Sequence, residues 1–448
     1  MRIAITKPLF AWDCLDDSPS LKTVQQLLGL LPDAKLLAAL RQCRGKGRDD
    51  YPVQTLWGVV VLKTLLRHIT YQSCLEELKR NPALRQLIGI DADASIPDAC
   101  NVSRFLNVLG RPEHLALMAE AFDAMTAQLG RVVPDLGQQT AGDATGLSAQ
   151  RPRSQAGQAT SLPLPTGGKK EYRDDEGRVT KVVEWFGYKL HLLVDVKHEL
   201  ALAYQVSSAN VGDNEVIPAL VEQAKKNLPD DRTETLAYDK AADTQAVHRT
   251  LHAAGISPVV QIRSLWHEEP ERPIPGHEGD NVVHDELGTV YCYDTASRVP
   301  VRHPMAYIGH EKSRGTLKYR CPALHEGWTC PNQHRCNAGK TYGKTVRVRR
   351  EIDLRRFPPI PRATKKFERL YRGRTSVERV NARLKVFWGS DDGNVTGAER
   401  FGANVGVVML VHAGLATLLA ATPRREGTLG KMRLGPIAKA LHQRYELG

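Results

Sequence analysis

Four residues suited to phosphate chemistry recur at helical spacing in the last fifth of this 448-residue chain. Tyr371, Arg374, Glu378 and Lys385 lie at offsets of zero, three, seven and fourteen residues. If the stretch is one α-helix, a rotation of about 100° per residue brings all four within about 60° of one another. On such a face the carboxylate can hold a divalent metal, the cations can neutralise phosphates and the ring can stack on a base.

The same stretch has a second interpretation. Thr375-x-x-Glu378 fits a capping box, in which Glu378 would only satisfy the start of a helix. The helix would then begin near Ser376, and Tyr371 and Arg374 would lie on the preceding turn. Both interpretations stay open on this stretch alone, and partner carboxylates elsewhere in the chain would favour the first.

Two such carboxylates follow predicted strands. Asp143 ends a short strand that starts at Gln138, and Asp239 ends the strand that starts at Thr235. Either Asp alone is more often a turn or capping residue, but ligands gather at strand ends in an α/β sheet. The elements around them are a strand hairpin, two helices and a last strand: 182–195 with 200–206, Asp213 to Asn227, Asp243 to Ala254, and Ile256 to Ile262. We therefore predict a mixed α/β sheet flanked by helices.

Four motifs together resemble the bacterial insertion-sequence transposases of the DDE type. They are Y-x2-R-x3-E-x6-K at 371–385, D-x-T-G-L at 143–147, G-Y-K-x-H at 187–191 and Y-D-K-A-A-D-T at 238–244. The resemblance implies a ribonuclease H-like core in which Asp143, Asp239 and Glu378 bind metal. The usual Gly-Tyr-Asp after the Lys is Ala-Ala-Asp here, which leaves Asp243 as a rival to Asp239, and we favour Asp239.

The resemblance also implies a reaction. A transposase would bind terminal inverted repeats, cleave DNA at the element ends with two Mg²⁺ or Mn²⁺ ions, and join the 3′ ends to target DNA. Asp143 would bridge both ions, with Asp239 on one and Glu378 on the other. Lys385 and Arg374 would hold flanking phosphates and Tyr371 would position the end base. Two alternatives are a domesticated DNA-binding regulator without catalysis and a metal-dependent nuclease without strand transfer.

Residues 1–131 are predicted to be helical, because apolar residues recur there at helical spacing. The segments from Thr70 and from Asp98 could form a helix-turn-helix-like pair that presents Arg104 to DNA, or they could belong to an ordinary helical bundle. The pattern G-I-D-x4-I-P-D-x4-S-R-F at 89–105 resembles the N-terminal helical domain of many of these transposases. We therefore expect residues 1–131 to bind DNA ends, and the family to act as a homodimer or larger assembly on paired ends.

Bulk properties agree with a double-stranded DNA partner. Lys and Arg outnumber Asp and Glu by 62 to 50, which gives a net charge of +12. The N-terminal residues lack an apolar stretch of signal-peptide length. The longest apolar tract, Val405 to Ala421, is interrupted by His412 and favours a buried helix. We expect no membrane segment and a bacterial cytoplasmic protein, associated with the nucleoid when DNA-bound.

The core is predicted in two parts, 132–263 and 362–422, with a β-rich insertion at 264–361 and a basic tail at 423–448. The segment 149–168 is predicted to be a loop, and the basic run from Arg347 to Arg362 could carry a phosphate backbone past the site. The insertion holds Cys292, Cys321, Cys330 and Cys336, with His325 and His334 between them. Cys-x8-Cys-x5-Cys is not a standard zinc spacing, so a small zinc site of Cys321, Cys330 and Cys336 and reduced buried thiols stay open as alternatives.

Overall fold

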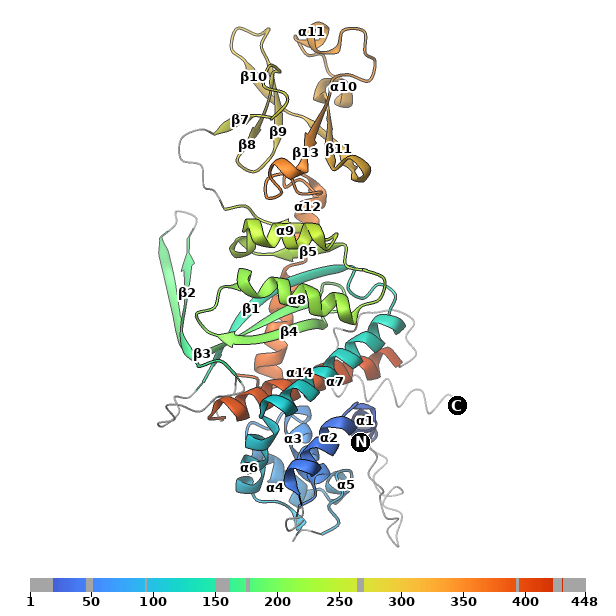
Figure 1. The fold of residues 1–448 in the computed structure, drawn as a ribbon, viewed down its shortest axis with the longest axis vertical. Coiled ribbons are helices and arrows are strands. Elements are labelled where there is room, and N and C mark those ends of the chain that lie inside the picture. The colour runs from blue at the N-terminus through green and yellow to red at the C-terminus, as the bar shows by residue number, and fades with distance from the viewer. Residues whose placement is uncertain are drawn as a thin grey trace.

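The computed structural model describes residues 19–45, 51–92, 95–149, 162–174, 178–263, 270–391, 395–421 and 429. Figure 1 shows an elongated molecule with helices at one end, a sheet in the middle and the insertion at the other end. The tail predicted at 423–448 lies outside the described residues apart from Leu429.

The described N-terminal residues are helical, as predicted. The helices are α1 (Pro19–Leu30), α2 (Ala34–Arg44), α3 (Val53–Leu65), α4 (Tyr71–Arg80), α5 (Pro82–Gln86), α6 (Ala99–Leu109) and α7 (Pro112–Val132). The short α5 was not predicted. It begins where Asn81 accepts a hydrogen bond from the Leu84 amide and proline follows at the first helical position, which are two ordinary start signals.

Helix α14 (Ala398–Ala421) joins the helical end to the sheet, and it contains the tract predicted to be a buried helix. It is long and apolar enough to cross a membrane by composition, but 94% of its apolar window is buried inside the protein. It packs on α1, α3, α6, α7 and strand β4 (Ala201–Ser208). Burial lowers the pKa of His412 to about 3, so its neutral ring accepts a hydrogen bond from the Ala201 amide at 3.0 Å.

The central sheet has the strand order β2-β3-β1-β5-β6, and β4 also pairs with β3. Its members are β1 (Gln139–Ser148), β2 (Thr166–Arg173), β3 (Val179–Asp195), β4, β5 (Thr235–Tyr238) and β6 (Ser257–Val260). Strand β1 runs antiparallel to β3 and parallel to β5. The mixed sheet and the β3–β4 hairpin agree with the prediction. Helices α8 (Asp213–Asn227) and α9 (Gln245–Ala253) pack on the sheet, and the bounds of α8 are those predicted.

Strand β2 overturns part of the loop predicted at 149–168. Strand β2 pairs with the first half of β3, and β4 pairs with the second half of β3 along the same edge of that strand. The first half of β3 is exposed and the second half is buried, so β2 and β3 extend beyond the sheet as a ribbon (Figure 1). Its sequence, Thr-Gly-Gly-Lys-Lys-Glu-Tyr-Arg, has no apolar alternation, because a ribbon with little buried surface needs none.

The insertion is β-rich, as predicted, and has its own apolar core. One sheet has the order β10-β9-β8-β7, and the other β11-β12-β13. The strands are β7 (Glu271–Pro273), β8 (Val282–Asp285), β9 (Val290–Asp294), β10 (Val301–Pro304), β11 (Ala306–Glu311), β12 (Thr316–Arg320) and β13 (Thr345–Arg349). Two short helices, α10 (Pro322–Glu326) and α11 (Gln333–Asn337), lie between β12 and β13. By contrast, the N-terminal helices and the central sheet share one continuous core.

Candidate active site

Two aspartates stand side by side where the parallel strands β1 and β5 end their pairing. Thr140 faces Leu236 and Ala141 faces Ala237, so the same register places Asp143 opposite Asp239. The sequence predicted that Asp143 would lie in a turn at the end of the strand. It lies in the middle of β1 instead, because β1 continues along β3 to Ser148. The strand order therefore brings together two acids that are ninety-six positions apart.

A glycine sets the spacing of the two strands beside these acids. A Cβ atom on Gly142 would lie 2.3 Å from Cε2 of Tyr238, so only glycine leaves room for that ring. The Tyr238 ring is buried, and its hydroxyl has no hydrogen-bond partner among the residues described. Gly142 and Tyr238 immediately precede the two aspartates, so this contact fixes how far apart the carboxylates stand.

The surroundings of Asp143 are acidic and poorly hydrated. Burial is the main cause that raises the pKa of Asp143 to about 6, and the nearby charges of Asp239 and Asp213 raise it further. Lys170 on the β2–β3 ribbon acts in the opposite direction. A set of close carboxylates of this kind is stabilised by a bound cation, which supplies the missing opposite charge. The donors are oxygens, as Mg²⁺ requires.

Asp213 is the acid near the site that the sequence reasoning missed. It begins α8, and its carboxylate lies 3.4 Å from Nζ of Lys189 and 3.7 Å from Nδ1 of the buried His191. Both partners come from the G-Y-K-x-H motif, whose role the sequence left unassigned. The signal that could have found Asp213 is its place after the end of β4, the same argument that selected Asp143 and Asp239.

The segment that carries Glu378 differs from the single helix predicted. Tyr371 lies on α12 (Lys365–Arg372), Arg374 caps α13 (Thr375–Ala382), and Lys385 lies on a π-helical turn over Arg383–Phe387. The break falls at Gly373, where a Cβ atom would lie 2.9 Å from Val196 and from the Leu370 carbonyl oxygen. The chain changes pitch there because the helix passes tightly over the turn that follows β3.

Glu378 faces solvent and forms an ion pair with Arg374 at 3.0 Å. It does not form the capping box, since the cap residue of α13 makes no side-chain capping bond. Helix α13 packs on β1 and β3, and the charges of both Asp239 and Glu378 raise the pKa of Tyr371, after burial as the main cause. Within the described ranges no three His, Cys, Asp or Glu side chains converge closely enough, as they lie, to hold an ion.

The residues predicted to contact DNA are placed differently from one another. Lys385 donates to the Gly146 carbonyl at 2.7 Å and pairs with Asp391 at 2.9 Å, so it secures the end of β1. Arg374 is engaged by Glu378. Tyr371 is half-buried, with its ring stacked on Phe367 at 5.9 Å. Arg104 is exposed on α6, which packs beside α4 as the predicted pair requires.

Asp243, the rival to Asp239, is fully enclosed in a hydrogen-bonded cluster. It accepts hydrogen bonds from Arg355 at 2.7 and 3.2 Å, from the Arg263 amide at 2.9 Å, and lies 3.0 Å from Nε2 of His248. Burial raises its pKa, but these hydrogen bonds outweigh burial and hold the pKa well below its usual range. Asp243 therefore links Arg355, near the end of the insertion, to His248 on α9. Because both of its oxygens are occupied by these contacts, we favour Asp239 rather than Asp243 as the metal ligand.

We expect the substitution Asp243→Asn to lower the free energy of unfolding by about 3 kcal/mol, because the partly buried Arg355 would lose its counter-charge and the buried side chain at position 243 would lose charge-assisted hydrogen bonds. The folded-state pKa lies below the unfolded one, so the contribution of Asp243 is present above about pH 4 and is lost as the pH falls towards the folded value. Urea unfolding at several pH values measures this. The exposed-pair variant Asp174→Asn should change little, and equal effects would contradict the assignment.

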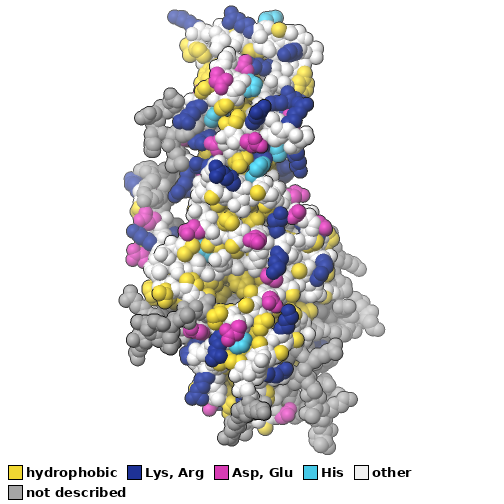
Figure 2. All heavy atoms as spheres, in the orientation of Figure 1, with side chains coloured by type: hydrophobic (Ala, Val, Ile, Leu, Met, Phe, Trp, Pro, Cys, Tyr) yellow, Lys and Arg dark blue, Asp and Glu magenta, His cyan; other side chains and the backbone are white. Residues whose placement is uncertain are grey.

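The basic run from Arg347 to Arg362 does not form the open phosphate track that was predicted. Arg347 and Arg349 are exposed and alternate with the buried Val346 and Val348, as the sequence pattern indicated. The later arginines turn inward instead. Arg350 is buried, Arg355 binds Asp243, Arg356 binds Asp353, and Arg362 donates to the carbonyls of Val260 and Arg355. Figure 2 shows Lys and Arg spread along the visible face, interspersed with Asp and Glu.

Comparison with protein families agrees with this architecture. A family model described as a transposase DDE domain matches residues 137–413, which run from the start of β1 through most of α14. A second model, described as a transposase domain (DUF772), matches residues 13–107. No curated protein matches the chain significantly. Since the first model covers more than half of the sequence, the chain belongs to the DDE transposase-domain family.

Proposed function

We propose that this DNA transposase binds the terminal inverted repeats of its element, cleaves the DNA at the element ends and joins the 3′ ends to target DNA. The observation that carries the proposal is the register of β1 and β5, which sets Asp143 opposite Asp239, with helix α13 packed on β1 and carrying Glu378 on its exposed side. These acids come from three separate elements, and the family match spans all of them.

Asp143 and Asp239 would hold the divalent ions, Mg²⁺ or Mn²⁺, since Mg²⁺ is usually bound through one or two carboxylates plus substrate phosphates. When bound, such ions activate the attacking oxygen and stabilise the leaving oxygen of a phosphodiester. Glu378 would complete the set by exchanging its Arg374 partner for metal. That exchange would free the Arg374 guanidinium for a phosphate beside the cut.

Lys385 and Tyr371 would act next to this set. Because Lys385 is tied to Gly146 and Asp391, its first role would be to hold β1 in place, with a phosphate contact following if Asp391 is displaced. Tyr371 would present its exposed edge to the terminal base of the element. At the other end of the molecule, α6 would offer Arg104 to the inverted repeat, and a homodimer or larger assembly in the cytoplasm would pair the two ends.

The test is an assay with the purified full chain, a labelled inverted-repeat duplex, Mg²⁺ or Mn²⁺ and a supercoiled plasmid. Metal-dependent cleavage at the repeat end, followed by plasmid products that carry the label, is the expected result. Cleavage without joined products would point to a nuclease instead. Binding without any cleavage would point to a regulator, and either outcome would overturn the proposal.

A further inference from the structure

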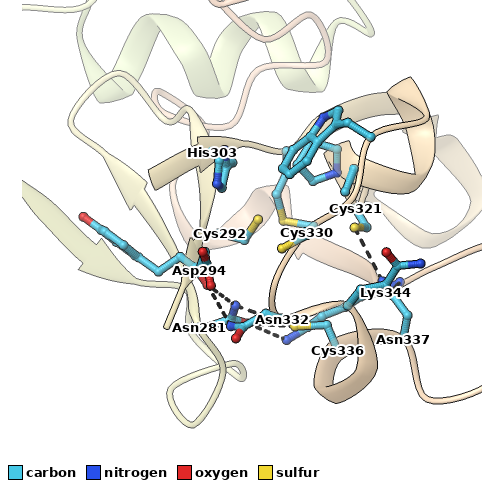
Figure 3. A pocket seen from close by; sticks show the side chains of 16 residues that line it. Asn281, Cys292, Asp294, His303, Cys321, Cys330, Asn332, Cys336, Asn337 and Lys344 are labelled. Carbon is cyan, nitrogen blue, oxygen red and sulfur yellow. Dashed lines mark hydrogen bonds between the residues drawn. The ribbon is translucent and has the colours of Figure 1, made fainter. Parts of the chain in front are cut away.

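Four cysteines from four segments of the insertion surround one small cavity. Cys292 comes from β9, Cys321 precedes α10, Cys330 lies in the loop between α10 and α11, and Cys336 lies on α11. The cavity has a volume of about 20 Å³, which is room for about one water molecule. Figure 3 shows the four side chains around it, and none of them forms a disulfide. His325 and His334, which the sequence placed among the cysteines, do not line it.

The cavity is built as thiolate sites are, with polar hydrogens aimed at sulfur. The buried Asn337 amide donates to Sγ of Cys321 at 3.7 Å, and the Asn281 amide donates to Sγ of Cys336 at 3.8 Å. Burial raises the pKa of the Cys330 thiol, and a hydrogen bond with the backbone of Asn332 acts in the opposite direction. Hydrogen-bond donors of this kind stabilise a thiolate, and in metal sites they hold the ligand side chains in position.

The segment between β12 and β13 makes little contribution to the apolar core of the insertion and gains little stability from it. The apolar core of the insertion consists of nine buried side chains, and none of them lies between residues 320 and 345. The buried residues of that segment are instead small or polar: Cys321, Pro322, Ala323, Asn332, Asn337 and Gly343. Short segments without a hydrophobic core are commonly stapled by disulfides or a structural metal. The free thiols exclude the first of these for the cysteines described.

We propose that Cys292, Cys321, Cys330 and Cys336 together bind one structural Zn²⁺ ion, which ties α10 and α11 to β9. Four sulfur ligands without an open position suit a closed tetrahedral zinc site. As they lie, no three of the candidate ligand side chains within the described ranges converge to hold an ion. The cysteine side chains therefore turn inward about their χ1 bonds on binding, and each loses its proton.

The site extends the sequence-based alternative in one respect. The spacing of Cys321, Cys330 and Cys336 offered three ligands and left the fourth position open. Cys292 fills it from the other sheet, since Val282 pairs with Cys292 in the β8–β9 ladder and β12 carries the chain to Cys321. The metal would therefore join the two sheets of the insertion, besides anchoring the two short helices.

The experiment is metal analysis of the purified full chain, made in zinc-supplied cells without chelators, with sulfur coordination measured by X-ray absorption. We expect one zinc per chain, bound by four sulfurs at about 2.3 Å. Each of Cys292→Ser, Cys321→Ser, Cys330→Ser and Cys336→Ser should lose the zinc, whereas Cys100→Ser, which alters an exposed cysteine on α6, should keep it. If a serine variant fails to fold, the wild-type measurement still decides.

Three outcomes would overturn the proposal: wild-type protein without zinc, zinc with fewer than four sulfur ligands, or a disulfide among the four cysteines by thiol titration. Removal of zinc by a chelator should also lower the melting temperature of the wild-type protein and leave that of the Cys330→Ser variant unchanged. These measurements use no DNA and no Mg²⁺, so their result is independent of the proposed transposition reaction.

Discussion

Replacing Asp143 or Asp239 by asparagine is expected to abolish cleavage of the inverted-repeat end, with a loss of at least about 10³-fold in rate. Asparagine has nearly the same shape but cannot supply the negative charge that a divalent ion needs. Binding of the uncleaved repeat should stay within about twofold, because the predicted contacts with DNA are made by Arg104 on α6 and by Tyr371, Arg374 and Lys385, none of which is changed. Single-turnover cleavage and gel-shift titration measure the two effects.

The matched control is Asp231→Asn, which makes the same chemical change at an exposed aspartate paired with Lys225. It should leave cleavage unchanged. The metal-free Asp143→Asn protein should be at least as stable as the wild type, because the change removes a buried charge that Asp239 and Asp213 repel. A variant at Asp143 that still cleaves at near wild-type rate in Mg²⁺ would contradict the assignment of the site.

The substitution Glu199→Ala is expected to lower the cleavage rate by about 10- to 100-fold with little change in DNA affinity. Glu199 lies in the turn between β3 and β4 and pairs with Arg379 and Arg383, which follow Glu378 on the same helical segment. Its backbone carbonyl also accepts from Arg383 at 3.1 Å. Glu199→Ala keeps the carbonyl contact and the packing of α13 on β1 and β3, but it removes both ion pairs. A resulting shift of about 1 Å at Glu378 can cost about 10² in rate.

Glu199→Gln separates positioning from simple loss of charge, because its single amide oxygen can still accept from one of the two arginines, and it should recover part of the rate. The matched control is Glu368→Ala, which removes an exposed ion pair with Arg372 on the neighbouring α12. Mn²⁺ titration by thermal shift gives a second readout, since a displaced Glu378 should weaken metal affinity in Glu199→Ala alone. Equal losses in Glu199→Ala and Glu368→Ala would show that α13 needs no such fastening.

Secondary structure was predicted correctly where the local sequence pattern alone determines the element. Helix α8 has one apolar side and clear end signals, and its bounds agree with the structure. Strand β2 was missed because its partner supplies the pairing and its own residues carry no alternation. The predicted single helix from Tyr371 to Lys385 is interrupted after Arg372, where Gly373 meets Val196, a contact that no spacing within the stretch can reveal. It changes again to a π-helical turn at Arg383.

The density of basic residues in a segment was the least reliable predictor of its exposure to solvent. The arginines at 350, 355, 356 and 362 suggested an open basic track, but each has partners from distant parts of the chain or from its own turn. The planar guanidinium group of arginine can donate hydrogen bonds to carboxylates and carbonyls within a protein as well as to the phosphates of a ligand. The two aspartates could be predicted because motif resemblance and strand order agree on them. Asp213 was missed although it also follows a strand, β4, whereas Cys292 joins its cluster only through folding.

The position of α14 has a consequence for synthesis of the protein. The helix fills the space between α1, α3, α6 and α7, yet it is encoded almost four hundred residues after α1. On the ribosome, the first helices must therefore wait with an open apolar groove until nearly the whole chain has emerged. A prematurely terminated product would keep that groove open and would be a target for chaperones and proteases, so a partial polypeptide could not compete with the complete enzyme for element ends.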